Sequence, residues 1–377
     1  MRGVSRIAFV LALSVLNFAN ANDDLEAVKK ELSERRYLSY MKELLTYDER
    51  GQYRAQGVPF SVTWTNDPES KQHILVGCVL KGRDLGCLPA MVNMFREFKE
   101  GNYNSYQGRI TFFVENPQSI SLLSSNLASE ENIFFGNDEA KHDFEKVEKD
   151  RAGELKKLLR NVDLFIQMKQ TVSPIDKTFY SFPYDELTLE WARYLRASDT
   201  LIVPMKSNRK TMTDYARDLG VLTLSLEILQ KKDEADSVEQ KMKAYLLFRE
   251  TVKNALFARG QVASLRGIYA VSDELEKISG PLPKLKNFYL TTYEEPFLGE
   301  LTKLEQELVD FSPLKSGTLL GYQEGTDVVK TEIKAPRDGF VLHARYPKRD
   351  DMGATKEPFP RYLYQVIEKK EPLDLLR

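Results

Sequence analysis

Three charged side chains follow an apolar run within one short turn. The run "HILVGCVL" occupies residues 73–80, and Lys81, Arg83 and Asp84 lie in the turn "KGRDLG" that comes next. The Asp84 carboxylate is the kind of group that binds a metal ion, because it offers lone pairs at neutral pH. Lysine offers only N–H donors, since its ammonium keeps its proton well above pH 7. The turn therefore holds one candidate metal ligand beside two cations.

Polar residues also stand at the ends of later apolar runs. Asn116 follows "GRITFFVE", Lys169 ends "DLFIQMK", and Glu227 lies near the end of "GVLTLSLEIL". In a layered α/β domain, ligands and reacting groups collect beyond the carboxyl ends of the strands. We therefore expect Asn116, Lys169 and Glu227 to lie at one edge of a sheet, close to the turn at 81–84.

Hydrophobic periodicity divides the chain into alternating strands and helices. Short apolar runs predict strands, and apolar residues at every third or fourth position predict helices. The expected strands are 60–65, 73–80, 108–117, 163–169, 200–205 and 220–229, and the expected helices are 23–45, 88–101, 139–162, 211–219 and 233–260. The predicted fold class is α/β, with a mostly parallel or mixed sheet and helices on both faces.

The amino-acid composition of the chain changes at about residue 260. Glycine, proline and β-branched residues dominate in "SGTLLGYQEGTDVVKTEIKAPRDGFVLHARYP", which predicts short strands and turns. We therefore predict a signal peptide over residues 1–21, an α/β domain over 22–259 and a small β domain over 260–377.

The first 21 residues have the features of an export signal. Arg2 and Arg6 precede the apolar core "IAFVLALSVLNFA", which is too short to span a bilayer, and "ANA" ends at Ala21. We expect cleavage after Ala21 and a periplasmic or secreted chain with no stable membrane span. The alternative is an uncleaved N-terminal anchor. Lys and Arg number 54 against 56 Asp and Glu, so no basic excess indicates a nucleic-acid partner.

The two cysteines leave two possibilities open. Cys78 lies within an apolar run and Cys87 lies just past the turn, so their distance depends on the geometry of that turn. An oxidising compartment would allow a disulfide. Two separately buried thiols are the preferred prediction.

The order of these strand ends resembles the succinylglutamate desuccinylase/aspartoacylase family, within the zinc carboxypeptidase fold. That family begins its site with a strand and His-Gly-Asp/Asn-Glu and continues with Asn-Pro and Asp-Leu-Asn-Arg. A strand ending in Asp-Leu-His gives the third zinc ligand, and a strand ending in Thr-x-Glu gives the catalytic glutamate. The matching positions in this chain are Lys81 and Asp84, then Asn116 with Pro117, then Asn132, Lys169 and Glu227.

The departures from this pattern concern the metal and the ligand. The resemblance places Lys81 and Lys169 at the two histidine positions, which leaves Asp84 as the remaining zinc ligand. Arginine positions of the family hold Ser125 and Ile133, so Arg83, Asn116 and Asn132 remain as candidate ligand-binding residues. The three histidines, His73, His142 and His343, are each expected to be structural or solvated. We therefore expect no metal cofactor.

A charge count offers a reason for the two lysines. Two ammonium groups with Asp84 carry the same net charge as a zinc ion with two neutral histidines and one carboxylate. Lys81 and Lys169 would then lie near Asp84 and Glu227. The alternative is that both lysines are ordinary loop residues at the surface.

These residues favour an exported, catalytically degenerate protein of this fold. It would bind a small peptide or an acyl amino acid-like ligand, or an envelope protein partner, and the compartment suggests peptidoglycan peptides. The first alternative is an active metal-dependent amide hydrolase with an atypical site, in which zinc is bound and Glu227 is the general base. The second alternative is a purely structural protein whose cleft is filled by side chains.

Overall fold

The structure is a computed structural model, and it describes most of the chain between residues 29 and 372. The described residues are 29–30, 37–49, 57–67, 69–78, 86–117, 135, 143–173, 175–205, 211–231, 237–281, 284–296, 301–304, 308–324, 330–343 and 362–372. The predicted signal peptide and the turn at 81–84 lie outside these ranges, as do Ser125, Asn132, Ile133 and His142.

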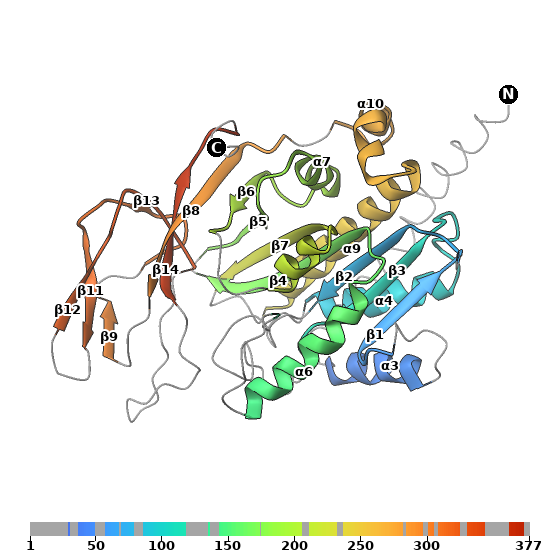
Figure 1. The fold of residues 1–377 in the computed structure, drawn as a ribbon, viewed down its shortest axis with the longest axis horizontal. Helices are drawn as coiled ribbons and strands as arrows, with labels where there is room; N and C mark the ends of the chain where they lie inside the picture. Colours follow the sequence, from blue (N-terminus) through green and yellow to red (C-terminus); the bar gives the residue numbers. More distant parts are fainter. Residues whose placement is uncertain are drawn as a thin grey trace.

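One long mixed sheet forms the centre of the molecule (Figure 1). In the described residues its strand order is β1-β3-β2-β4-β7-β5-β6-β8-β14-β13-β10. The strands are β1 (Ser61–Thr65), β2 (His73–Cys78), β3 (Arg109–Val114), β4 (Leu164–Ser173), β5 (Lys177–Ser181), β6 (Thr200–Val203), β7 (Leu222–Lys231), β8 (Asn287–Pro296), β10 (Pro313–Leu314), β13 (Gly339–Leu342) and β14 (Tyr362–Lys369). Strands β3, β2, β4 and β7 run parallel to one another, so their carboxyl ends meet at one edge.

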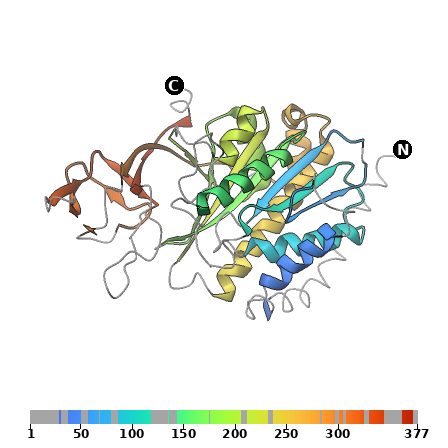
Figure 2. The same ribbon diagram turned by 60° about the horizontal axis from the view of Figure 1, so that its bottom comes forward.

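Helices cover both faces of this sheet (Figure 2). The helices are α3 (Tyr37–Glu49), α4 (Cys87–Lys99), α6 (Asp143–Leu158), α7 (Glu186–Leu195), α8 (Met212–Asp218), α9 (Val238–Gln261) and α10 (Ile268–Ser279). Ile74, Ile110 and Ile166 pack with α3, α4, α7 and α9 in the larger core. Their odd-numbered neighbours pack instead with α6 and α8, as Leu75 and Phe165 show. The predicted α/β class with helices on both faces is confirmed.

Local signals explain where several helices begin. Asp185 accepts a hydrogen bond from the Thr188 backbone N–H at the start of α7, and Ser237 does the same for Gln240 at the start of α9. Thr211 and Asp214 bond each other's backbone N–H groups in a capping box at the start of α8. Such side-chain acceptors satisfy N–H groups that have no partner within the first turn of a helix.

The C-terminal strands form two groups. Strands β8, β14, β13 and β10 continue the central sheet, whereas β9 (Leu301–Leu304), β11 (Leu319–Glu324) and β12 (Lys330–Lys334) form a separate three-stranded sheet. Their apolar side chains make a small core of their own, which includes Leu320, Val341 and Tyr364. We call the strands from β8 to β14 the β region. The domain boundary after residue 259 stays a prediction.

Several elements differ from the sequence-based expectation. The β texture predicted from residue 260 begins only at β8, because α9 continues to Gln261 and α10 follows at Ile268. Leu275 of α10 is fully buried against α7 and α9, so tertiary contact stabilises this short helix. Strand β5 and helix α7 were not predicted.

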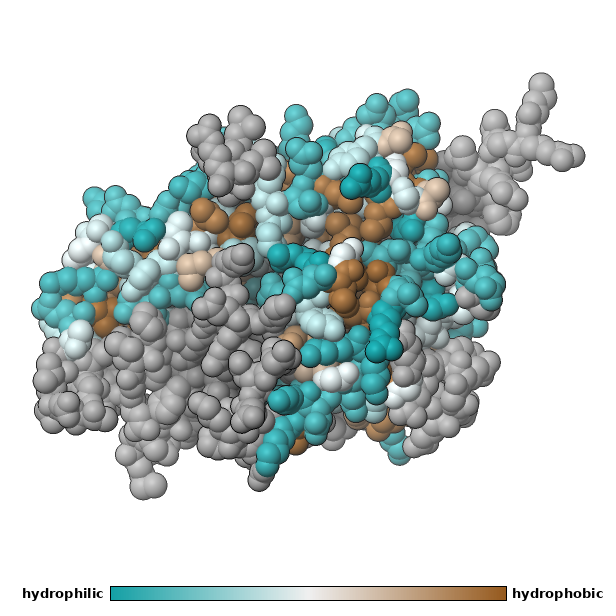
Figure 3. Space-filling model, viewed as in Figure 1, coloured by the Kyte–Doolittle hydropathy of each residue, from teal (hydrophilic) through white to brown (hydrophobic). Residues whose placement is uncertain are grey.

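The surface of the described residues is mainly polar. On the face in Figure 3, hydrophobic residues form separate patches among hydrophilic ones. Among the described helices, none combines the length and the apolar character that a bilayer span needs.

Candidate functional site

Strand alternation brings several polar side chains to one face of the sheet. Odd-numbered residues of β3, β4 and β7 face the α6 side, and the parallel register places Lys169 beside Glu227. Glu115, just past β3, and Gln167 on β4 belong to the same set, since their side chains are hydrogen-bonded. Glu115, Gln167, Lys169 and Glu227 therefore gather on one face, at the level where β2 and β3 end. Strands β4 and β7 continue past this level to Ser173 and Lys231, so Lys169 and Glu227 do not stand at the ends of their strands as the sequence predicted. The predicted proximity of Lys169 and Glu227 agrees with this register.

Glu115 is a buried carboxyl group close to two cations. Its Oε2 accepts a hydrogen bond of 2.6 Å from Gln167 Nε2. Burial raises the pKa of Glu115 from 4.5 to about 7, although the bond from Gln167 and the charges of Lys169 and Arg151 lower it. Glu115 can therefore gain or lose a proton near neutral pH. The sequence did not single out Glu115, because the Asn116-Pro117 pair was the candidate at this position and the burial of Glu115 depends on tertiary packing.

Arg151 of α6 fixes the end of strand β3. Its side chain is only 3% exposed, and it donates hydrogen bonds to the backbone carbonyls of Val114 (2.6 Å) and Glu115 (3.1 Å). It also pairs with Glu154 at 2.8 Å. Asn116 is buried directly beyond these carbonyls. Arg151 therefore positions the segment that carries Glu115 and Asn116.

Glu227 is held by residues from a neighbouring strand and from the β region. Thr171 Oγ1 on β4 donates to Glu227 Oε1 at 2.9 Å, and His343 Nδ1 lies 3.5 Å from the same oxygen. The side chains of Glu227 and His343 are 7% and 11% exposed. His343 was predicted to belong to the β domain and to be structural or solvated. The structure places this residue, directly after β13, against Glu227 of β7.

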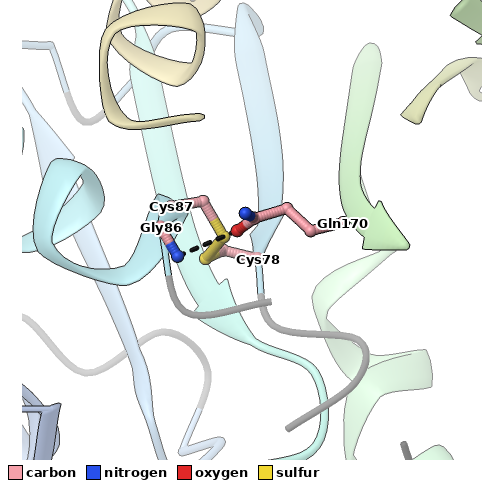
Figure 4. Close-up of a disulfide and its surroundings, with 4 residues drawn as sticks. All are labelled: Cys78, Gly86, Cys87 and Gln170. Atoms are coloured by element: carbon pink, nitrogen blue, oxygen red, sulfur yellow. Dashed lines mark hydrogen bonds between the residues drawn. A yellow bond between two sulfur atoms is a disulfide. The ribbon is translucent and has the colours of Figure 1, made fainter. Parts of the chain in front are cut away.

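The turn that carries Lys81, Arg83 and Asp84 lies outside the described residues, but both of its ends are described. Cys78 ends β2 and Cys87 begins α4, and the two form a disulfide with a Cα–Cα distance of 6.0 Å (Figure 4). The preferred prediction of two separate thiols is therefore wrong, because the start of α4 returns to the end of β2.

Gln170 of β4 adds a second anchor beside the disulfide. The backbone N–H of Gly86 donates to Gln170 Oε1 at 2.8 Å (Figure 4). A Cβ atom on Gly86 would lie 2.6 Å from the Cβ of Ala244 on α9, so a larger residue does not fit there without movement. The disulfide and this hydrogen bond hold the two ends of the turn against β4.

The side chains at this edge do not fit a zinc ion. Within the described ranges, no group of three histidine, cysteine, aspartate or glutamate residues is arranged to hold a metal. The position on β4 that the resemblance assigns to a histidine ligand holds Lys169, whose ammonium has no lone pair to offer. Among the described residues, Glu227 and His343 approach each other, but Glu115 is hydrogen-bonded to Gln167, and these donors do not form the three-ligand group of a catalytic zinc site.

Comparison with known proteins shows similarity in structure but not in sequence. No protein-family model matches the sequence, and no curated protein matches it. A succinylglutamate desuccinylase from Vibrio parahaemolyticus superposes with a TM-score of 0.60 at 12% identity, over 83% of this chain and 87% of that one. A succinylglutamate desuccinylase/aspartoacylase from Rhodobacter sphaeroides gives a TM-score of 0.51 at 14% identity, over 83% and 89% of the two chains.

A third solved structure has the same architecture. The product-bound ectoine utilization protein of Ruegeria pomeroyi gives a TM-score of 0.53 at 14% identity, over 82% of this chain and 88% of that one. The chain therefore has the fold of the succinylglutamate desuccinylase/aspartoacylase proteins, a deacylase fold, along most of its length. The predicted resemblance is confirmed at the level of the fold.

Proposed function

We propose that the protein is an exported, catalytically degenerate member of the deacylase fold that binds a ligand without zinc. The observation that carries this proposal is Lys169, which lies within β4 beside Glu227, on the face that holds Glu115. A zinc ion at this edge would face an ammonium group at close range. Metal-assisted hydrolysis needs the ion to acidify water and to polarise the carbonyl, so its loss removes both effects.

The ligand would be a small peptide or an acyl amino acid-like molecule, or an envelope protein would take its place. This choice rests on the deacylase fold and on the candidate residues Arg83, Asn116 and Asn132, of which Asn116 lies at the described edge. Among these ligands, the expected compartment favours peptides of the cell wall.

Export is the second part of the proposal. Its support is the buried Cys78–Cys87 disulfide together with the signal-like residues 1–21. Disulfides persist in oxidising compartments such as the periplasm and are rare in the cytosol.

Zinc content tests the loss of the metal site. Purified protein dialysed against excess zinc and then against buffer should retain well under one equivalent, because lysine replaces histidine at two ligand positions. Elemental analysis measures the ratio directly. The matched variant restores the family ligands by Lys81→His, Asp84→Glu and Lys169→His, and it should retain more zinc than the natural chain. One equivalent of zinc on the natural protein, lost on Asp84→Ala, would contradict the proposal.

A further inference from the structure

His343 adopts a backbone conformation that non-glycine residues rarely use. Its φ angle is +52°, in the left-handed region, directly after strand β13. This region disfavours side chains with a Cβ, and residues held there cluster at functional sites. The residue after β13 thereby carries its imidazole to Glu227 of β7.

The ring is held by contacts on two sides. Phe179 of β5 meets it edge to face with centroids 6.1 Å apart, and Nδ1 is buried with Glu227 Oε1 at 3.5 Å. Within the described residues Nδ1 makes no hydrogen bond that meets normal geometry. Because a carboxylate accepts hydrogen bonds but does not donate them, its approach favours a proton on Nδ1. The neutral ring then has its lone pair on Nε2. This is the tautomer that a carboxylate selects when it orients a histidine base.

Charged groups also lie on the elements that neighbour this pair. They are Lys169 on β4, beside Glu227 in the strand register, Lys177 on β5 and Asp310 before β10. Lys177 lies 3.8 Å above the ring of Phe311, and Asp310 accepts a hydrogen bond from Ser173. Glu227 is therefore the carboxylate that faces His343 among the described groups.

We propose that His343 is a metal-independent general base of this site and that Glu227 is its positioning residue. In the step that this pair supports, Nε2 takes a proton from a water molecule while the water oxygen bonds to an acyl carbonyl carbon. The tetrahedral species then expels its alcohol, which takes the proton back from Nε2. The products are a carboxylic acid and an alcohol, so atoms and charge balance without a co-reactant.

The proposed chemistry selects esters over amides. Without a metal ion to polarise the carbonyl, attack succeeds best on acyl groups that are already activated. An amide is the least activated of these groups, so the pair would hydrolyse an ester in a chain that has lost zinc-dependent amide hydrolysis. The inference goes beyond the proposed function and does not depend on the ligand of that function.

Nuclear magnetic resonance of the imidazole nitrogens tests the geometry. The chain has three histidines, so single variants assign their signals. The neutral His343 ring should be the Nδ1–H tautomer in the natural protein, and Glu227→Leu should return it to the usual Nε2–H form. An Nε2–H tautomer in the natural protein would overturn the proposal. This measurement needs no catalytic turnover.

Hydrolysis of p-nitrophenyl acetate tests the activity. Chelator-treated protein should hydrolyse it faster than buffer, with a rate that follows the deprotonated fraction of His343 measured on the same sample. His343→Gln should lower the rate about a hundredfold, the typical contribution of a general base, and Glu227→Gln at least about tenfold. His142→Gln should leave it unchanged.

Two outcomes of the hydrolysis experiment would overturn the inference. One is a rate equal to buffer, and the other is a rate that His343→Gln leaves intact in a variant with natural unfolding behaviour. Neither outcome touches the proposed function, which depends on zinc content. A rate that disappears with the chelator and returns with zinc would contradict both.

Discussion

At Glu115, burial and neighbouring charge act in opposite directions on one carboxyl group. Burial favours the neutral acid, whereas Gln167, Lys169 and Arg151 favour the carboxylate. The resulting pKa of about 7 lies well above the ordinary 4.5. Between these two values the folded chain holds more protons at Glu115 than the unfolded chain does. This group therefore lowers stability as pH rises from about 4.5 to 7.

Replacing Glu115 by glutamine should remove that loss. Glu115→Gln should be more stable than the natural protein by about 3 kcal/mol at pH 8 and nearly equal to it at pH 4.5, because each pKa unit corresponds to about 1.4 kcal/mol. Urea unfolding at both pH values measures the difference. The exposed Glu100→Gln is the matched control and should show no such difference. A constant offset at both pH values would contradict the pKa of Glu115.

His73 also contributes to the pH dependence of stability, so the effect of Glu115 has to be measured as a difference between the natural protein and the Glu115→Gln variant. Burial lowers its pKa from 6.5 to about 4, so its contribution to stability is lost as pH falls through that range. Nδ1 donates to the Asn161 carbonyl, and Nε2 accepts from the Thr111 hydroxyl. His73 and Glu115 change the free energy of unfolding in opposite directions over overlapping pH ranges. The difference between Glu115→Gln and the natural protein isolates the contribution of Glu115. His73 was predicted to be structural or solvated, and the structure buries it at the start of β2.

At the scale of elements, the end of β2 and the start of α4 form one closed unit. The Cys78–Cys87 bond spans a sequence separation of nine residues, and Gln170 holds Gly86 next to it. The contacts that fix the two ends of the turn join residues from different elements. Helical or strand periodicity in the sequence therefore does not reveal them.

Removing the disulfide should destabilise the chain. The double variant Cys78→Ala/Cys87→Ala should lose about 2–3 kcal/mol, since the cross-link restricts the unfolded chain over a short loop. Denaturant unfolding measures this loss, and the natural protein with reductant should shift in the same direction. Two free thiols titrated in unreduced, unfolded protein would show that the bond does not form.

At the scale of the whole molecule, the β region joins the α/β sheet through polar and aromatic contacts. Ser173 Oγ donates to Asp310 Oδ2 at 2.5 Å across 137 residues of sequence, and both side chains are buried. Phe311 meets Phe179 edge on, with centroids 6.1 Å apart. Phe179 also contacts His343, which lies 3.5 Å from Glu227. The β region is therefore part of the site's wall.

Ser173→Ala should weaken this junction. The variant should lose about 1–3 kcal/mol of unfolding free energy, because the buried Asp310 carboxylate loses a hydrogen-bond donor. Calorimetry or urea unfolding measures it. Ser264→Ala, at an exposed serine whose side chain makes no helix-cap hydrogen bond, should change stability by less than about 0.5 kcal/mol. Equal effects from the two variants would show that the junction hydrogen bond contributes nothing.

The sequence by itself determined most of the strands and helices of the α/β part and the proximity of Lys169 to Glu227. These features follow from local periodicity and from the rule that parallel strands end together. The resemblance in the order of strand ends was enough to predict the fold that solved structures confirm.

Tertiary structure alone decided the disulfide, the helix α10, the neutral-range pKa of Glu115 and the place of His343. Each depends on a contact or a burial that no short window of sequence contains. Glu115 meets Gln167 across 52 residues, and His343 meets Glu227 from a separate strand group. Local preferences set each element, but the packing of distant elements sets distances, burial and charge environment, and these decide the chemistry.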